Sequence, residues 1–142
     1  MKDFIILTDS TSDLTLELRQ EYNIEYVPMQ YIIDGKEYPA SLDWESHSPK
    51  TYYDLMRSGS RVFTAQIHRD VYYEAFQNAV SAGKEVIYIG CSSALSASIH
   101  VANLVAKEMT EQNPEAGIYC IDSLISSLGQ GYLAMEASRK RA

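Results

Sequence analysis

Short apolar runs of strand length alternate along the chain with segments in which apolar residues recur at helical spacing. The runs that indicate strands are residues 4–7, 24–29, 62–65, 85–89 and 118–121. A continuous apolar run is typical of a strand that is buried on both faces of a sheet. Pro28 falls inside the second run. Because proline donates no ladder hydrogen bond, we expect that strand to end there or to lie at an edge.

Helical spacing and capping residues mark the segments between these runs. The expected helices run from Asp13 to Asn23, from Ser48 to Gly59, from Asp70 to Gly83, over residues 95–109, and from about Gly131 to the end of the chain. Asp13, Ser48 and Asp70 are the expected N-cap residues, since their side chains accept hydrogen bonds from the first turn. Leu95 is expected on the apolar face of the fourth helix.

The order of these elements predicts an α/β fold. Strands that alternate with helices favour a mainly parallel β-sheet with helices on both faces. Asp34-Gly35 suits the left-handed turn of a β-hairpin over residues 31–38, which adds a small excursion to this sheet. We expect that hairpin and the loop from Ala40 to His47 to leave the core. No repeat or linker divides the chain, so residues 1–142 are expected to form one domain.

Composition and charge exclude several classes of function. The 142 residues are 46% hydrophobic and 22% charged, with a net charge of −7. An acidic chain without a basic cluster is a poor ligand for nucleic acid or anionic membranes. No stretch approaches the ~20 apolar residues of a membrane span, and none indicates a signal peptide, so a cytoplasmic protein is expected. Cys91 and Cys120 are expected to be free thiols.

Hydroxyl groups gather in the segments that follow four of the strands. These segments are Thr8–Asp13, Thr64–Gln66, Cys91–Ser98 and Asp122–Gly131. Ligands of open parallel sheets bind outside the carboxyl ends of the strands, where hydroxyls and free N–H groups favour an anion. Because these segments contain no Lys or Arg, a singly charged carboxylate is favoured over a triphosphate. Ser, Thr and Asp are also ordinary capping residues, so capping alone explains any one of these segments.

Enzyme functions find less support in the sequence. A serine nucleophile needs a base, and His47 is expected away from this edge, while His100 is expected on the solvent side of a helix. Phosphoryl transfer with Asp9 or His68 as the acceptor remains an alternative. A domain that uses an exposed apolar face for assembly is another. The cysteines lack zinc spacing and the acids are scattered, so no metal and no cofactor are expected.

Taken in order, the motifs of this chain resemble those of the DegV family from Phe4 to the end. They are Thr8-Asp9-Ser10-Thr11-Ser12-Asp13-Leu14, Val27-Pro28, Asp34-Gly35, Ser58-Gly59 before Thr64-Ala65-Gln66, Ser92-Ser93-Ala94-Leu95-Ser96, and Asp122-Ser123 leading to Ser127, Gly129 and Gly131. The resemblance implies a non-enzymatic protein that binds a long-chain fatty acid between two lobes. It presents the acyl carboxylate to a separate fatty acid kinase catalytic subunit. This chain would be the N-terminal, head-group-binding lobe, with the second lobe absent.

The resemblance also assigns roles to individual residues. Thr64, supported by Gln66, and Ser93, with its neighbour Ser92, would bind the carboxylate. The residues that would shape the surrounding loops are Asp9, Ser10, Ser96, Asp122 and Ser123. The sequence departs from the family at Ala65, where serine is usual, and at Ala97, where glycine is usual. The acyl tail could lie along Ile125, Leu128 and the final helix.

Overall fold

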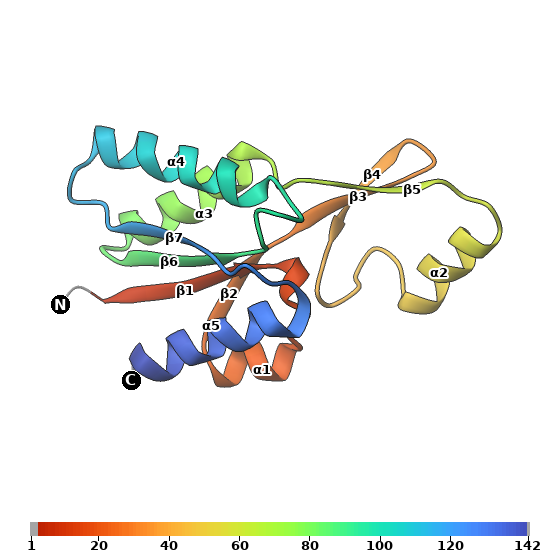
Figure 1. Cartoon of the computed structure of the whole chain (residues 1–142), viewed down its shortest axis with the longest axis horizontal. Helices are drawn as coiled ribbons and strands as arrows, with labels where there is room; N and C mark the ends of the chain where they lie inside the picture. Colours follow the sequence, from red (N-terminus) through yellow and green to blue (C-terminus); the bar gives the residue numbers. More distant parts are fainter. Residues whose placement is uncertain (1–2, 142) are drawn as a thin grey trace.

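The computed structural model describes residues 3–141 and contains two β-sheets (Figure 1). The larger sheet has four parallel strands in the order β2-β1-β6-β7. Its strands are β1 (Phe4–Asp9), β2 (Ile24–Val27), β6 (Glu85–Gly90) and β7 (Ile118–Asp122). The smaller antiparallel sheet has the order β4-β3-β5 and is formed by β3 (Met29–Ile33), β4 (Lys36–Ala40) and β5 (Val62–Ala65).

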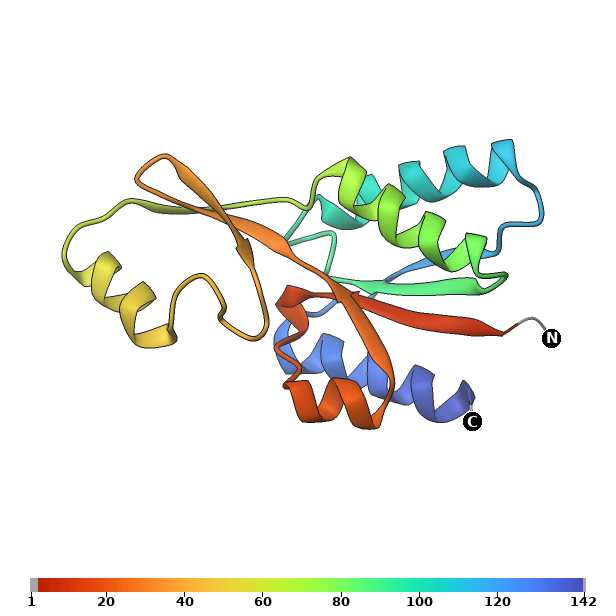
Figure 2. The same cartoon turned by 180° about the vertical axis from the view of Figure 1, so that it is seen from behind.

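Helices cover both faces of the parallel sheet, which confirms the predicted fold class. Helices α3 (Arg69–Ser81) and α4 (Ser98–Gln112) lie on one face, and α1 (Leu16–Glu21) and α5 (Ser127–Arg141) lie on the other (Figures 1 and 2). A short 3-10 helix, Ser10–Ser12, follows β1 directly. Helix α2 (Pro49–Arg57) lies beyond the small sheet, and together they form an arm that extends from the body. None of the helices within residues 3–141 is long and apolar enough to cross a membrane.

The apolar core is divided between the two faces of the parallel sheet. On the α3–α4 face, Tyr72, Phe76 and Tyr88 are fully buried and pack with edge or tilted ring contacts. On the α5 face, Ile6 and Leu14 are the central buried side chains. Burial of apolar surface on both faces explains why β1 and β6 are continuous apolar runs in the sequence. The two cysteines are free, as predicted.

The third strand run, Val62–Ala65, was expected in the parallel sheet but lies outside it. It pairs antiparallel with β3, with Thr64 opposite Tyr31. Pro28 ends β2, and the chain then continues into β3, whose two edges pair with β4 and β5. The side chain of Phe63 is 59% exposed, which an inner strand of a covered parallel sheet would not allow. The predicted hairpin is therefore one part of a larger three-stranded excursion.

Several predicted helix boundaries are wrong. Thr15 caps α1, because its hydroxyl accepts a hydrogen bond from Leu18 N, whereas Asp13 adopts the left-handed conformation that ends the 3-10 helix. Helix α3 follows His68 and has no side-chain cap, so Asp70 lies in its first turn, where a carboxylate favours the helix dipole. Ser48 caps α2 as predicted.

The last two helices also begin at other residues than expected. Helix α4 starts at Ser98, and Leu95 lies in the preceding turn with 70% of its surface exposed. The N–H of Leu95 donates to the carbonyl of Ser92, and this hydrogen bond closes the turn. Helix α5 begins at Ser127 rather than Gly131 and is described as far as Arg141. The predicted end of this helix at Ala142 lies outside the described residues.

Gly131 lies at a close approach of α5 to the loop after β1, and we expect it not to tolerate alanine. A Cβ at this position would lie 2.8 Å from the carbonyl oxygen of Ser12 and 2.8 Å from the side chain of Leu14. Because the backbone must shift to make room, Gly131→Ala is expected to lower the free energy of unfolding by about 1–3 kcal/mol. Urea unfolding followed by circular dichroism measures this change.

Gly129 provides the matched control for that experiment. It lies in the same helix, but the atoms nearest to an added Cβ all belong to the side chain of Ile125, which is 45% exposed. That side chain can rotate away, and alanine favours the helix over glycine by about 1 kcal/mol. We therefore expect Gly129→Ala to be neutral or stabilising. Equal losses in the two variants would contradict the close approach at Gly131.

Candidate functional site

Asp9 connects the loops that follow β1 and β6. Its carboxylate is fully buried and accepts hydrogen bonds from Thr11 N at 2.9 Å, from the Thr11 hydroxyl, from the Tyr88 hydroxyl at 2.7 Å and from Cys91 N at 3.3 Å. A buried carboxylate is stable only when donors surround it in this way. These contacts fix the positions of the two loops relative to each other, while the loop-shaping role assigned to Asp9 remains a prediction.

A pair of buried tyrosines extends the Asp9 network into the core. The hydroxyls of Tyr72 and Tyr88 are 2.8 Å apart, and Tyr88 donates onward to Asp9. Burial raises the pKa of Tyr72, and burial followed by the neighbouring Asp9 charge raises the pKa of Tyr88. Both phenols are therefore neutral donors at physiological pH.

Gln130 is a buried residue of the site that the sequence analysis missed. Its side chain is fully buried on α5 and donates to the Thr8 hydroxyl at 3.1 Å and to the Ile89 carbonyl at 3.3 Å, and its Oε1 lies 2.8 Å from the Thr11 hydroxyl oxygen. It thereby joins α5 to the carboxyl ends of β1 and β6. Its four-residue spacing from the buried Ala134 is the signal that could have placed it on the inner face of the helix.

Ser92 and Ser93 occupy the turn that follows β6, beside the loop that follows β7. Ser92 is buried, and its N–H donates to the Ile125 carbonyl at 2.9 Å. Ser93 is exposed, and its N–H donates to the Asp122 carboxylate at 3.2 Å. A hydrogen bond from the Ser93 side chain, followed by the N–H of Leu124, lowers the pKa of Asp122. The Ser93 hydroxyl is thus within reach of a carboxylate that belongs to the protein itself.

The other residues with predicted loop-shaping roles also contact the backbone. Ser10 accepts from Met29 N at 2.9 Å, Ser96 accepts from Ser98 N at 3.2 Å, and Ser123 donates to the Ile125 carbonyl at 2.8 Å. These contacts lie within or between the loops at the carboxyl ends of the strands. The roles themselves stay predictions.

Thr64 lines a pocket of about 250 Å³ between the arm and the loop after β1. Ser10 and Asp13 contribute to it from the body, and the arm contributes aromatic walls. These walls are Tyr31, Trp44, Tyr52 and Tyr53. The sequence analysis did not single them out, although three of them flank the Ser48-Pro49 helix start.

His47 lines the same pocket, which corrects the expectation that it lies away from the site. Its Nδ1 is 2.7 Å from the Tyr31 hydroxyl. The physical reason is that β5 returns along β3, which places Thr64 in the arm together with the loop that carries His47. Sequence order alone did not reveal this return.

The structure brings the predicted site residues together in two groups. Thr64 and Ser10 share the aromatic pocket, whereas Ser92, Ser93, Asp122 and Ser123 belong to the adjoining loops after β6 and β7. Gln66, Ser92 and Ser93 do not line the pocket, and Gln66 is exposed. A contact from Ile67 N to the Ser98 hydroxyl ties the segment after β5 to the start of α4. Both groups lie where the arm joins the body (Figures 1 and 2).

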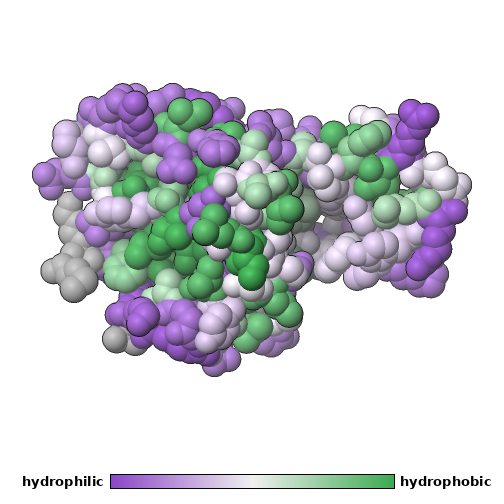
Figure 3. Space-filling model, in the orientation of Figure 1, coloured by the Kyte–Doolittle hydropathy of each residue, from purple (hydrophilic) through white to green (hydrophobic). Residues whose placement is uncertain are grey.

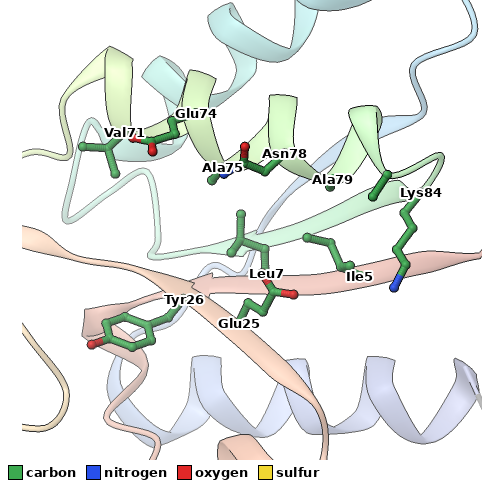
Figure 4. A pocket seen from close by; sticks show the side chains of 11 residues that line it. Ile5, Leu7, Glu25, Tyr26, Val71, Glu74, Ala75, Asn78, Ala79 and Lys84 are labelled. Atoms are coloured by element: carbon green, nitrogen blue, oxygen red, sulfur yellow. The ribbon is translucent and has the colours of Figure 1, made fainter.

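A second pocket, of about 390 Å³, lies between α3 and the strands β1 and β2 (Figure 4). Ile5 and Leu7 form its floor, and Glu25, Glu74 and Lys84 lie around it. None of the predicted site residues lines this pocket. Within residues 3–141, no group of three or more His, Cys, Asp or Glu side chains is placed to hold a metal ion.

Comparisons with known proteins agree on one family. A family model described as "Uncharacterised protein, DegV family" matches residues 3–142. A DegV domain-containing protein of Clostridium perfringens is 33% identical over 141 residues, which cover 99% of this chain and 48% of that protein. A DegV domain-containing 15.5 kDa protein of Staphylococcus aureus is 35% identical over 128 residues, which cover 90% of this chain and 86% of that protein.

A solved structure shows the same fold. It is described as fatty acid binding of a DegV family protein from Thermus thermophilus, and it matches with a TM-score of 0.84 and 26% identity over 98% of this chain and 47% of that chain. The chain therefore spans about half the length of the Clostridium and Thermus proteins. The match of the family model over nearly the whole sequence, together with the shared fold, shows that the chain belongs to the DegV family.

Proposed function

We propose that this chain binds the carboxylate of a long-chain fatty acid with the hydroxyls of Thr64 and Ser93. The observation that carries the proposal is that the hydroxyl-rich loops after β1, β6 and β7, which contain no Lys or Arg, lie where the arm strand that carries Thr64 joins the body, in a chain whose fold matches that of a Thermus protein described as binding fatty acid. Hydroxyl donors suit a singly charged head group better than a polyphosphate.

The charges around the site constrain how a head group can bind. Asp13 and Glu45 line the aromatic pocket, so we place the carboxylate on the Thr64 side, toward the turn of Ser92 and Ser93. The Ser93 hydroxyl has to turn from Asp122 to the ligand, because one hydroxyl proton cannot serve two carboxylates. Gln66 would support Thr64. We further propose that the bound carboxylate is presented to a separate fatty acid kinase catalytic subunit.

The structure gives less support to phosphoryl transfer on this chain. The Asp9 carboxylate is fully buried and already surrounded by donors, so an incoming phosphoryl group cannot reach it without opening the loops. His68 is exposed, and its Nε2 lies 2.9 Å from the Glu37 carboxylate. Neither residue has the arrangement of a positioned phosphoryl acceptor.

Removing the two hydroxyls is expected to weaken fatty acid binding. Each of Thr64→Ala and Ser93→Ala removes one hydrogen bond to a charged head group, which is worth about 1.5–3 kcal/mol and corresponds to a ~10- to 150-fold loss of affinity. Binding of labelled palmitate measures the affinity, and native mass spectrometry of the purified protein detects acyl chains that are already bound.

Controls for this experiment come from hydroxyls on the outer helices. Thr110 on α4 donates to the Ala106 carbonyl, and Ser81 on α3 accepts from Gln77. Thr110→Ala and Ser81→Ala should bind palmitate as the unmodified chain does. The proposal fails if the unmodified chain binds no fatty acid, or if the site variants and the controls bind equally well.

A further inference from the structure

A row of buried side-chain hydroxyls runs through the core between α3, α4 and β6. Tyr88 on β6 donates to the Asp9 carboxylate at 2.7 Å, and the Tyr72 hydroxyl on α3 lies 2.8 Å from the Tyr88 hydroxyl. Helix α3 lies against β6, which brings the two phenols together (Figures 1 and 2). All three residues are fully buried, so water does not compete for these hydrogen bonds.

The row continues from Tyr72 to the start of α4. Burial chiefly raises the pKa of Tyr72, and a side-chain hydrogen bond with Ser98 is among the contacts that oppose this rise. The Ser98 side chain is buried, and its hydroxyl accepts from Ile67 N at 3.1 Å. Ile67 is the second residue after β5, the strand that carries Thr64. The row therefore ends on the backbone of the segment that follows β5.

The direction of donation along the row follows from the number of protons. Tyr88 has one hydroxyl proton and gives it to Asp9, so Tyr72 has to donate to Tyr88. The proton of Tyr72 is then committed, which leaves Ser98 as the donor in its hydrogen bond with Tyr72. Every hydroxyl of the row thus donates toward the one carboxylate. Hydrogen bonds in such a chain strengthen one another in a core of low dielectric constant.

At its other end the row reaches the turn that carries Ser93. The Asp9 carboxylate accepts from Cys91 N at 3.3 Å, and Cys91 precedes Ser93 by two residues. One set of buried contacts therefore runs from Ile67 N, just after Thr64, to Cys91 N, just before Ser93. Two segments that are distant in the sequence are tied to the same buried row.

The turn also has a support on its outer side, from the loop after β7. Ser93 is exposed, and its N–H donates to the Asp122 carboxylate at 3.2 Å. In the same loop Leu124 is 78% exposed and Ile125 is 45% exposed. Figure 3 shows hydrophobic atoms gathered at the surface over this part of the molecule. A loop with few buried contacts opens easily, so the buried row is the firmer of the two supports.

Packing alone does not explain the hydroxyls of this row. Phenylalanine would fill most of the space of Tyr72, as Phe76 does one turn later on the buried face of α3. A buried hydroxyl carries a desolvation cost that only its hydrogen bonds offset. Two phenols in the centre of the core therefore indicate that the polar row has a task besides filling space.

We infer that Tyr72, Tyr88 and Ser98 are positioning residues for the head-group site. They are buried, and they act through the backbone by fixing the spacing between the hydroxyls of Thr64 and Ser93. The inference rests on the proposed function, since the spacing matters only if both hydroxyls bind the same carboxylate. Donors that are held in place before the ligand arrives bind it more tightly, because less ordering is left to occur on binding.

Binding of labelled palmitate to the purified chain tests the role of Tyr72. Tyr72→Phe keeps the ring and breaks the row in its middle, so we expect a ~3- to 10-fold loss of affinity, smaller than the loss from removing the Thr64 hydroxyl itself. Tyr73→Phe makes the same change at the neighbouring residue, which is 37% exposed, and should leave the affinity unchanged. Phe76→Leu loosens the same core without removing a hydroxyl. It should lower stability but keep the affinity within about twofold.

A double-mutant cycle separates positioning from a general loosening of the core. A device that sets the spacing of two hydroxyls matters only while both are present. In the Ser93→Ala background, Tyr72→Phe should therefore cost less than about twofold in affinity. A merely structural effect would instead multiply the two losses, and that result would overturn the inference. If the unmodified chain binds no palmitate, the proposed function fails and the positioning role fails with it. If the chain binds palmitate and Tyr72→Phe binds it equally well, only the positioning role fails.

The link between the two segments can also be measured without a ligand. Ile67 N and Cys91 N lie at opposite ends of the row, and the resonance of an amide proton responds to its hydrogen bond. In amide NMR spectra, Tyr72→Phe should shift the proton resonances of both residues, and Tyr73→Phe should shift neither. A shift at one end alone would show that the row does not join the segment after β5 to the turn of Ser93.

Discussion

Replacing Asp9 by alanine is expected to lower the free energy of unfolding by about 3–5 kcal/mol. The change removes a fully buried carboxylate and leaves the Tyr88 hydroxyl and the N–H of Cys91 without their acceptor. Buried donors without partners each cost about 1–3 kcal/mol. The loop after β1 also loses its tie through Thr11 N.

Two further variants make the Asp9 prediction specific. Tyr88→Phe removes only one donor and leaves the carboxylate in place, so we expect a smaller loss, of about 1–2 kcal/mol. Asp70→Ala changes an exposed aspartate in the first turn of α3 and should cost at most about 1 kcal/mol. Urea unfolding of the purified variants measures all three. If Asp9→Ala were no more destabilising than Asp70→Ala, the network would not hold the loops.

The fold of the body was predictable because its signals are local. A strand such as Glu85–Gly90 is an apolar run bounded by polar residues, and the helix Arg69–Ser81 places Tyr72, Phe76 and Ala79 on one face through its own spacing. These patterns need no knowledge of distant partners. Boundaries were less well predicted, since the cap of α1 depends on the left-handed Asp13, which a sequence pattern does not show.

The site was less predictable because its contacts join residues far apart in the chain. Asp9 meets Tyr88 across 79 positions, and Gln130 meets Thr8 across 122. The aromatic pocket forms only when Val62–Ala65 pairs with β3 instead of the parallel sheet, and strand pairing depends on the partner as much as on the strand. The hydroxyl-rich loops were visible in the sequence, but their division into two groups was not.

Raising the pH above about 9 is expected to destabilise the folded chain steeply, because two buried tyrosines and the half-buried Cys120 thiol keep their protons only in the folded state. Burial raises the pKa of Tyr72 and Tyr88 above the ordinary value of 10.0, and it raises the pKa of the Cys120 thiol from 9.0 to about 12. The unfolded chain loses these protons at the ordinary values. It therefore binds fewer protons than the folded chain at alkaline pH, and stability falls as the pH rises.

The size of the effect follows from the number of protons. Each group contributes fully to stability below its unfolded pKa, and each lowers the free energy of unfolding by about 1.4 kcal/mol per pH unit above it. Cys120 contributes this loss of stability between pH 9 and about 12, and each of the two tyrosines contributes it from pH 10 upward. The combined slope above pH 10 should approach about 4 kcal/mol per pH unit, which is large against the usual stability of a domain.

Urea unfolding between pH 8 and 11.5 measures this slope. Tyr72→Phe removes one of the titrating groups, so its slope above pH 10 should be shallower by about 1.4 kcal/mol per pH unit, even though the variant is less stable at neutral pH. Tyr73→Phe, which changes the exposed neighbour on α3, should leave the slope as it is. The absorbance of tyrosinate gives an independent reading, since the buried pair should ionise only as the chain unfolds. A slope that is the same in Tyr72→Phe and in the unmodified chain would show that Tyr72 is not held neutral by the fold.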